Sequence, residues 1–222
     1  MALTNWEPFD IRESMISKFS EKPGRGWLVQ FCYCILAGSL LTGCAWTKTP
    51  VQMTLAPKMN QPSKESPKAA LKVAPVADNR PVADKTVLIQ KQNAYGNTTG
   101  AYVTQKPVAE IFCDGLETAL KQSGLETTNG TQYVLESKIQ GFDYQTIEGF
   151  WQGTLIAKVT VRFDLVNQTN QLPVWHDTYI GQDRAQSALG TGQFVADSFS
   201  RASEDVIQQL LTDPMFRSYF WP

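Results

Sequence analysis

Apolar and polar residues alternate over two stretches in the middle of the chain. Between Leu155 and Leu165 the odd positions are apolar and most even positions are polar, and Tyr133 to Ile139 shows a similar alternation. A period of two residues is typical of a strand with one buried face. A polar segment at 167–171 then leads into a third strand around 174–181. The pattern therefore predicts antiparallel strands that share one buried face.

Two segments have the spacing of amphipathic helices. Apolar residues recur every three or four positions over 107–123 and over 192–212, and Pro214 marks the end of the second segment. Two short strands are expected around Leu71–Val73 and Val87–Ile89, with a loop at 78–81 between them. These elements predict an α+β fold, in which an antiparallel sheet has two helices packed on one face.

An apolar run from Trp27 to Gly43 precedes these elements. It is interrupted by Gln30 and is shorter than the about 20 apolar residues that a membrane-spanning helix needs. Lys18, Lys22 and Arg25 stand shortly before it. Basic residues, then a short apolar run, then a polar tract are typical of a secretory signal peptide, with Met15 as an alternative start.

The run ends in Leu41-Thr42-Gly43-Cys44, which resembles the lipobox of bacterial lipoproteins. Small residues let a peptidase bind the extended backbone closely, and the thiol accepts the diacylglyceryl group. We therefore predict cleavage between Gly43 and Cys44 and a covalent, palmitate-type lipid anchor on Cys44. The alternative, a cysteine in an ordinary transmembrane anchor, is disfavoured by the short run. Ala45 follows where inner-membrane lipoproteins of enteric-type bacteria often carry Asp, which predicts a periplasm-facing position on the outer membrane.

Removal of the signal peptide, residues 1–43, leaves 179 residues, which suits one domain with a tether. The mature chain keeps 16 basic and 17 acidic residues, because four of each are removed, and this balance gives no reason to expect nucleic-acid binding. Residues 44–70 are rich in Pro, Lys and Ser, a composition that buries too little apolar surface to fold. We predict a disordered tether over 44–70 that joins the lipid to a domain, residues 71–222. An extended proline-rich tether has a rise of about 3.1 Å per residue, which would hold the domain away from the lipid.

The cysteines argue against a disulfide and against a metal centre. Cys32 and Cys34 lie in the signal peptide and Cys44 carries the lipid, so Cys113 is the remaining thiol of the mature chain. A single His excludes a Cys/His metal cluster, and no cofactor is expected besides the covalent lipid. Cys113 is either a small buried apolar residue or a reactive thiol, and the general tendency of cysteine favours burial.

The lipobox, the alternating strand AKVTVRFDLVNQ with its polar hairpin and the terminal helix FVADSFSRASEDVIQQLL occur in this order. Together they resemble the YajG-like family of uncharacterised bacterial envelope lipoproteins, over about residues 70–213. More distantly, the layout is similar to small lipoproteins that assist envelope transport, such as lipopolysaccharide-assembly and transporter-auxiliary lipoproteins. The resemblance implies an outer-membrane lipoprotein without established catalytic residues.

Candidate catalytic residues do not form a recognisable motif. His176 and Asp177 are neighbours on a predicted strand and should point to opposite faces, so Asp177 cannot orient His176 toward Ser187 as a triad requires. Glu204 and Asp205 fall on the polar side of the last helix, where a solvated face is expected. The glycines at 190–192 and 96–100 lack phosphate-loop spacing, and no nucleophile elbow is present. The sequence therefore predicts that the protein is not an enzyme.

Two aromatic clusters are candidate contact sites. Phe150 and Trp151 lie between Gly149 and Gly153, where a hairpin tip would point them outward as partner-binding residues; alternatively, both fold back over the sheet edge. The tail, residues 216–222, is the second cluster, and it either packs on the domain or contacts a partner.

These features predict a lipid-anchored, non-catalytic interaction or envelope-assembly module whose partners are the membrane and an envelope protein or lipid. An accessory lipoprotein of a lipid or lipopolysaccharide transport system is the alternative, and an envelope hydrolase is a more distant one. A groove for an acyl chain between sheet and helices would favour transport. A polar pocket with convergent carboxylates would favour the hydrolase.

Overall fold

The computed structural model describes residues 47–57, 67–92, 95–127, 131–147, 153–187 and 191–222. All of them belong to the second of two compact units, residues 45–222. The predicted signal peptide, with Gly43 and Cys44, lies outside the described residues. In chain order the elements are β1 (Thr47–Pro50), β2 (Leu71–Val73), β3 (Ala77–Asp78), β4 (Val87–Gln92), β5 (Thr98–Val103), α2 (Val108–Gln122), β6 (Tyr133–Ile147), β7 (Gly153–Asn167), β8 (Leu172–Ser187), α3 (Gly192–Thr212) and α4 (Pro214–Phe220).

The main sheet is built on the three long strands β6, β7 and β8, which pair antiparallel in chain order. The short strands β2 and β3 pair in parallel with β6 on its other side. A register shift between Ile139 and Gly141 bends β6. Odd residues such as Leu135 and Ile139 are buried before the shift, and the even residue Phe142 is buried after it. The three predicted strands are thus confirmed, and each is longer than the segment that alternates.

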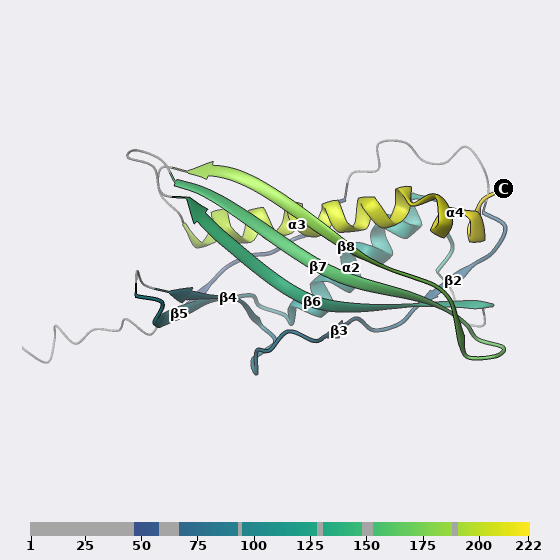
Figure 1. Ribbon diagram of the computed structural model, residues 1–222, viewed down its shortest axis with the longest axis horizontal. Coiled ribbons are helices and arrows are strands. Elements are labelled where there is room, and N and C mark those ends of the chain that lie inside the picture. The colour runs from purple at the N-terminus through teal and green to yellow at the C-terminus, as the bar shows by residue number, and fades with distance from the viewer. Residues whose placement is uncertain (1–46, 58–66, 93–94, 128–130, 148–152, 188–190) are drawn as a thin grey trace, which may run out of the picture. The chain divides into compact units, whose positions relative to one another are not determined.

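The helices α2 and α3 cover one face of this sheet (Figure 1). The odd residues of β7 from Leu155 to Leu165 are all buried beneath them. Phe112 of α2 packs against Phe163 of β7 with ring centroids 6.4 Å apart, and α3 makes a similar contact with β6. Full burial of one such side chain contributes about 1.5–3 kcal/mol. The predicted α+β fold, with helices on one face of an antiparallel sheet, is confirmed.

Both predicted helices form, with ends that follow from local chemistry. After α2, Gly124 has a φ of 86°, the left-handed conformation that glycine adopts without strain, and its N–H donates to Lys121 O. Thr191 caps α3 by accepting a hydrogen bond from the Phe194 N–H. Asp213 ends α3 and also caps α4 through the Phe216 N–H, at 2.7 Å. The chain therefore turns at Pro214 into a third helix that the periodicity did not predict.

A second, three-stranded sheet has the order β1-β5-β4. β4 and β5 form an antiparallel hairpin, and β1 adds in parallel to β5, with Thr47 opposite Gly100. The sequence predicted β4 as a short strand, but it gave no indication of β1 or β5. Since β1 pairs with a strand some fifty positions away, only the folded chain can create it.

The aromatic tail packs on the domain. Phe216, Phe220 and Trp221 are buried, and the Tyr219 hydroxyl donates to Val174 O of β8 at 2.9 Å. The N–H of Lys68 donates to Phe220 O at 2.7 Å, so the chain just before β2 is joined to the C-terminal helix. Of the two alternatives for the tail, packing is the one that the structure shows.

Candidate functional site

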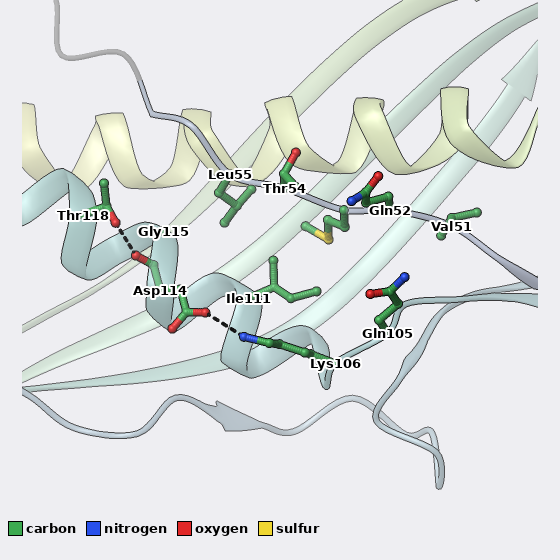
Figure 2. Close-up of a pocket in the computed structure, with 11 residues that line it drawn as sticks. Val51, Gln52, Thr54, Leu55, Gln105, Lys106, Ile111, Asp114, Gly115 and Thr118 are labelled. Atoms are coloured by element: carbon green, nitrogen blue, oxygen red, sulfur yellow. Dashed lines mark hydrogen bonds and ion pairs between the residues drawn. The ribbon is translucent and has the colours of Figure 1, made fainter.

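Residues 51–57, which we call the strap, lie between α2 and α3 (Figure 2). Val51, Met53 and Pro57 are buried, Leu55 is half-buried, and the residues between them are exposed. The tether predicted over 44–70 is therefore wrong for residues 47–57, which form β1 and the strap of the folded domain. Residues 58–66 lie outside the part of the chain that the structure describes.

Polar side chains of α3 hold the strap backbone. Gln193 exchanges two hydrogen bonds with Gln52: its Oε1 accepts from the Gln52 N–H at 3.1 Å, and its Nε2 donates to the Gln52 O at 2.8 Å. Further along, Glu204 Oε1 accepts from the Ala56 N–H at 2.8 Å. These side chains satisfy backbone groups that a neighbouring strand would otherwise satisfy. The proline-rich segment is ordered for this reason.

The sequence does carry a signal for the strap, although a weak one. Apolar residues occupy alternate positions at Val51, Met53, Leu55 and Pro57, which is a strand-like period of two. Composition outweighed this pattern in our interpretation because the surrounding residues are rich in Pro, Lys and Ser.

A cavity of about 330 Å³ lies between the strap and α2. Its apolar part is formed by Val51, Met53, Leu55 and Ile111, and Gln105, Lys106, Asp114 and Thr118 form its polar rim (Figure 2). Lys106 Nζ lies 3.6 Å from Asp114 Oδ2, but both side chains are more than 60% exposed, so the pair contributes little stability. The volume is at the lower end of the range for ligand pockets. An apolar floor with a weakly charged rim is suited to a contact with another molecule, and it holds no convergent carboxylates.

A second cavity, of about 610 Å³, lies between β4 and β6, and Arg80 is one of the residues that line it. The guanidinium is almost fully buried; it pairs with Asp78 at 2.7 Å and donates to the carbonyls of Val87 and Leu88. It also lies 4.9 Å from the ring centroid of Phe142. Arg80 therefore joins β3, β4 and β6, and through them the two sheets.

Two buried carboxylates, Asp78 and Asp164, have lowered pKa values that sequence analysis did not anticipate. Burial by itself would raise the pKa of Asp78, but hydrogen bonds and the charge of Arg80 outweigh it, so that the pKa lies below the usual value. Asp164 on the outer face of β7 behaves in the same way: burial acts upward, and Arg162 and Lys138, at 2.9 and 3.0 Å, lower the pKa overall. Both groups have a structural ion-pair partner, so neither is poised as a general acid at neutral pH.

The residues considered for a triad are not brought together. His176 is exposed on the outer face of β8 and pairs in register with Asp164. Ser187 is eleven positions further along the same strand, which at about 3.3 Å per residue is roughly 36 Å away. The structure therefore excludes a catalytic triad of His176, Asp177 and Ser187.

The acidic pair on the polar side of α3 also has a structural role. Glu204 binds the strap at Ala56, and Asp205 Oδ2 accepts from the Gln182 N–H of β8 at 3.1 Å. Gln209 of α3 also donates to Ile180 O at 3.0 Å. Side chains of α3 thus bind outward-pointing backbone groups of β8, which is the edge strand of the sheet.

Cys113 is a half-buried free thiol on α2. Burial and the nearby charge of Glu117 raise the pKa of the thiol, and a hydrogen bond from the Val76 backbone acts weakly in the other direction. A raised pKa leaves less thiolate at neutral pH. This environment is that of a structural cysteine.

The partner-binding candidates Phe150 and Trp151 lie outside the described residues, as do Gly43 and Cys44. The structure does describe the strand ends on either side of the first pair, Ile147 and Gly153. Their predicted roles stay predictions.

Among the described residues, no group of three or more His, Cys, Asp or Glu is placed to hold a metal ion. No helix within the described ranges has the length and apolarity needed to cross a membrane.

Comparison with protein-family models and with curated proteins gives no match. Among solved structures, protein XCC0632 of Xanthomonas campestris, from the DUF330 family, matches with a TM-score of 0.55 and 18% identity over 73% of this chain and 92% of that chain. A minor lipoprotein of Acinetobacter baumannii matches with a TM-score of 0.40 and 14% identity over 52% and 90% of the two chains. PelC of Paraburkholderia phytofirmans, described as a dodecamer, matches with a TM-score of 0.37 and 15% identity over 64% and 85%. At these identities the first match shows a shared fold and nothing about activity.

Proposed function

We propose that the chain is a lipid-anchored, non-catalytic lipoprotein of the bacterial envelope that acts as an interaction or assembly module. The observation that carries the proposal is the tetrapeptide Leu41–Cys44 at the end of a short apolar run, shortly before β1. In this proposal Cys44 is the lipidated residue, Gly43–Cys44 is the cleavage site, and the domain faces the periplasm from the outer membrane. Kinship with YajG-like lipoproteins is part of the same proposal.

The structural roles of the charged residues support the proposal that the protein is not an enzyme. Asp78, Asp164, Glu204 and Asp205 each bind a partner that holds two elements of the fold together. Convergent carboxylates in a polar pocket would have favoured a hydrolase, and the lining of the strap cavity has one carboxylate, Asp114. An interaction module needs only accessible surface, and Phe150 and Trp151 are the partner-binding residues that we assign to it.

The transport-accessory alternative is supported less well. It calls for a groove between sheet and helices that accepts an acyl chain, and this layer is filled by buried side chains such as Phe112, Phe163 and Phe199. The cavity beside β6 is larger, but its lining includes Gln90, Gln92 and Gln140, whose amides suit an acyl chain poorly. The transport role therefore ranks second.

The lipid anchor is tested with Cys44→Ala, and Cys113→Ala is the matched control at the other cysteine of the mature chain. Wild type and Cys113→Ala should incorporate labelled palmitate and have the intact mass of the acylated chain that begins at residue 44. Cys44→Ala should remain an unacylated, uncut precursor. Mature wild-type protein without lipid would contradict the proposal.

Sorting is tested separately by density fractionation of membranes from an enteric-type host. Wild type should band with the outer membrane, and Ala45→Asp should move toward the inner membrane. Wild type that bands with the inner membrane would contradict the assignment to the outer membrane and leave the anchor unaffected.

A further inference from the structure

We infer that the end of the domain formed by the start of β1 and the β4–β5 hairpin lies against the lipid bilayer surface. The inference rests on the proposed function because it uses the acylated Cys44. The short chain between Cys44 and the domain supports it. β1 begins at Thr47, three residues after Cys44, and three fully extended residues span at most about 10 Å. The headgroup layer of a bilayer is itself about 5–8 Å thick, so this end of the domain has no room to stand away from it.

The pairing of β1 decides which surface is brought to the lipid. Thr47 lies opposite Gly100, near the start of β5, and the last pair of the β4–β5 hairpin joins Gln92 to Thr98. The hairpin turn and the N-terminus of β1 therefore lie at the same end of the strands of this sheet. Tyr95 in this turn is 89% exposed, the highest value among the exposed large apolar side chains of the described residues.

A second apolar side chain lies at the same end of the domain. β6 ends at Ile147, whose side chain is 51% exposed, and Figure 1 shows the tips of β6, β7 and β8 at the end where β4 and β5 lie. The start of α3 fixes this arrangement, since a Cβ on Gly192 would come within 3 Å of Tyr102 of β5 and Val51 of the strap. The short β4–β5 sheet and the long strands therefore end together.

The chemistry of this end fits the interfacial region of a lipid layer. Tyrosine combines an apolar ring with a polar tip and is enriched where hydrocarbon meets headgroups. The basic side chains of β1 and β4 already have partners within the domain. Lys48 Nζ lies 2.7 Å from Asp84 Oδ2, and Lys91 donates to Thr49 Oγ1 with its ammonium 4.4 Å from the Tyr102 ring centroid. We therefore assign the contact to apolar and interfacial burial, with little contribution from attraction to anionic headgroups, so added salt should weaken it little.

The test places a photocrosslinking residue at each end of the acylated full-length protein. Tyr95→p-benzoylphenylalanine replaces one exposed aromatic side chain with another, and Ile147→p-benzoylphenylalanine is a second probe of the same end. The matched control is Leu172→p-benzoylphenylalanine at the start of β8, next to the turn that follows β7. Leu172 is an exposed apolar residue, at 59%, and its fifteen residues of separation from Ser187 along β8 place it roughly 50 Å from the tips.

Photolysis in intact cells should give phospholipid adducts at Tyr95 and Ile147 with about tenfold higher yield than at Leu172. The same ratio is expected for purified protein in vesicles of phosphatidylethanolamine with a minor share of phosphatidylglycerol, at low and at high salt. Equal yields at the two ends, or protein adducts in place of lipid adducts at Tyr95, would overturn the inference. Intact mass separates the two proposals: acylated protein without lipid adducts at Tyr95 refutes only the orientation, and absence of acylation refutes both.

Discussion

Leu55 of the strap occupies the space next to Gly115 of α2 that a larger side chain at position 115 would need. A Cβ built on Gly115 would lie 2.7 Å from both Cβ and Cδ1 of Leu55. Real Cβ atoms do not approach other carbon atoms this closely, so the strap can dock in this position only because residue 115 is glycine. The contact joins two segments that are sixty residues apart in the sequence.

Gly115→Ala should destabilise the protein, although the same change usually stabilises a helix interior by about 1 kcal/mol. Here the added methyl group displaces Leu55, and overpacking of this kind costs about 1–3 kcal/mol. Chemical denaturation should show a lower free energy of unfolding, and limited proteolysis should show faster cleavage within residues 51–57.

The control for Gly115→Ala is Leu55→Gly, alone and in combination. Removal of the Leu55 side chain costs apolar burial but leaves space for the new methyl group. The loss in the double variant should therefore be smaller than the sum of the single losses by about 1 kcal/mol or more. Additive losses would show that the Leu55 side chain does not restrict the size of the residue at position 115.

Asp78→Asn tests the buried ion pair that joins the two sheets. Both side chains are 4% exposed, and removal of one charge leaves Arg80 buried without its partner. We expect a loss of about 3–5 kcal/mol in the free energy of unfolding. Glu117→Gln is the matched control at the exposed pair with Lys121, where about 0.5 kcal/mol or less should be lost. Equal effects of the two changes would show that Arg80 does not depend on Asp78.

The stability of the protein should fall in acid because of Asp78 and Asp164. The pKa of each is lower in the folded chain than the unfolded value of about 3.9, so the unfolded state binds protons more readily. The stabilisation is therefore complete above about pH 5 and is lost as the pH falls through the lowered pKa values. Unfolding curves between about pH 6 and pH 2 should show this slope, and Asp78→Asn should have a shallower one. An unchanged slope in the variant would exclude Asp78 as a source of the acid sensitivity.

Cys113 should react slowly with thiol reagents in the native protein. Its side chain is half-buried, and burial raises the pKa of the thiol, so little thiolate is accessible at neutral pH. The rate of labelling should increase strongly in denaturant. Native labelling as fast as in denaturant would mark Cys113 as a reactive thiol.

Trp151→Ala tests whether the loop between β6 and β7 binds a partner. Phe150 and Trp151 are adjacent and cannot both point inward in an extended chain, so at least one is expected to be exposed. Association with a membrane or protein partner should weaken by about 2 kcal/mol if Trp151 is a hot spot, and the free energy of unfolding should change by less than about 1 kcal/mol. Unfolding of the variant would show instead that Trp151 is a core residue.

The sequence by itself determined the elements whose signal is local. The alternation within residues 155–165 predicted β7 and its buried face, and the apolar spacing over 192–212 predicted α3 with the bounds that the structure has. These patterns are reliable because a strand or helix with one buried face must repeat its apolar residues at the period of its own backbone. The lipobox is local in the same sense, and it alone gave the proposed anchor.

The tertiary structure decided what depends on partners distant in the sequence. The order in residues 47–57 comes from pairing with β5 and from Gln193 and Glu204 on α3, none of which can be inferred from the local composition. The burial of Asp164 depends likewise on Lys138, which the pairing of β6 with β7 brings within 3.0 Å. Long-range contacts satisfy the backbone and charged groups of these residues, so a segment whose composition predicts a tether folds as a strand and a strap.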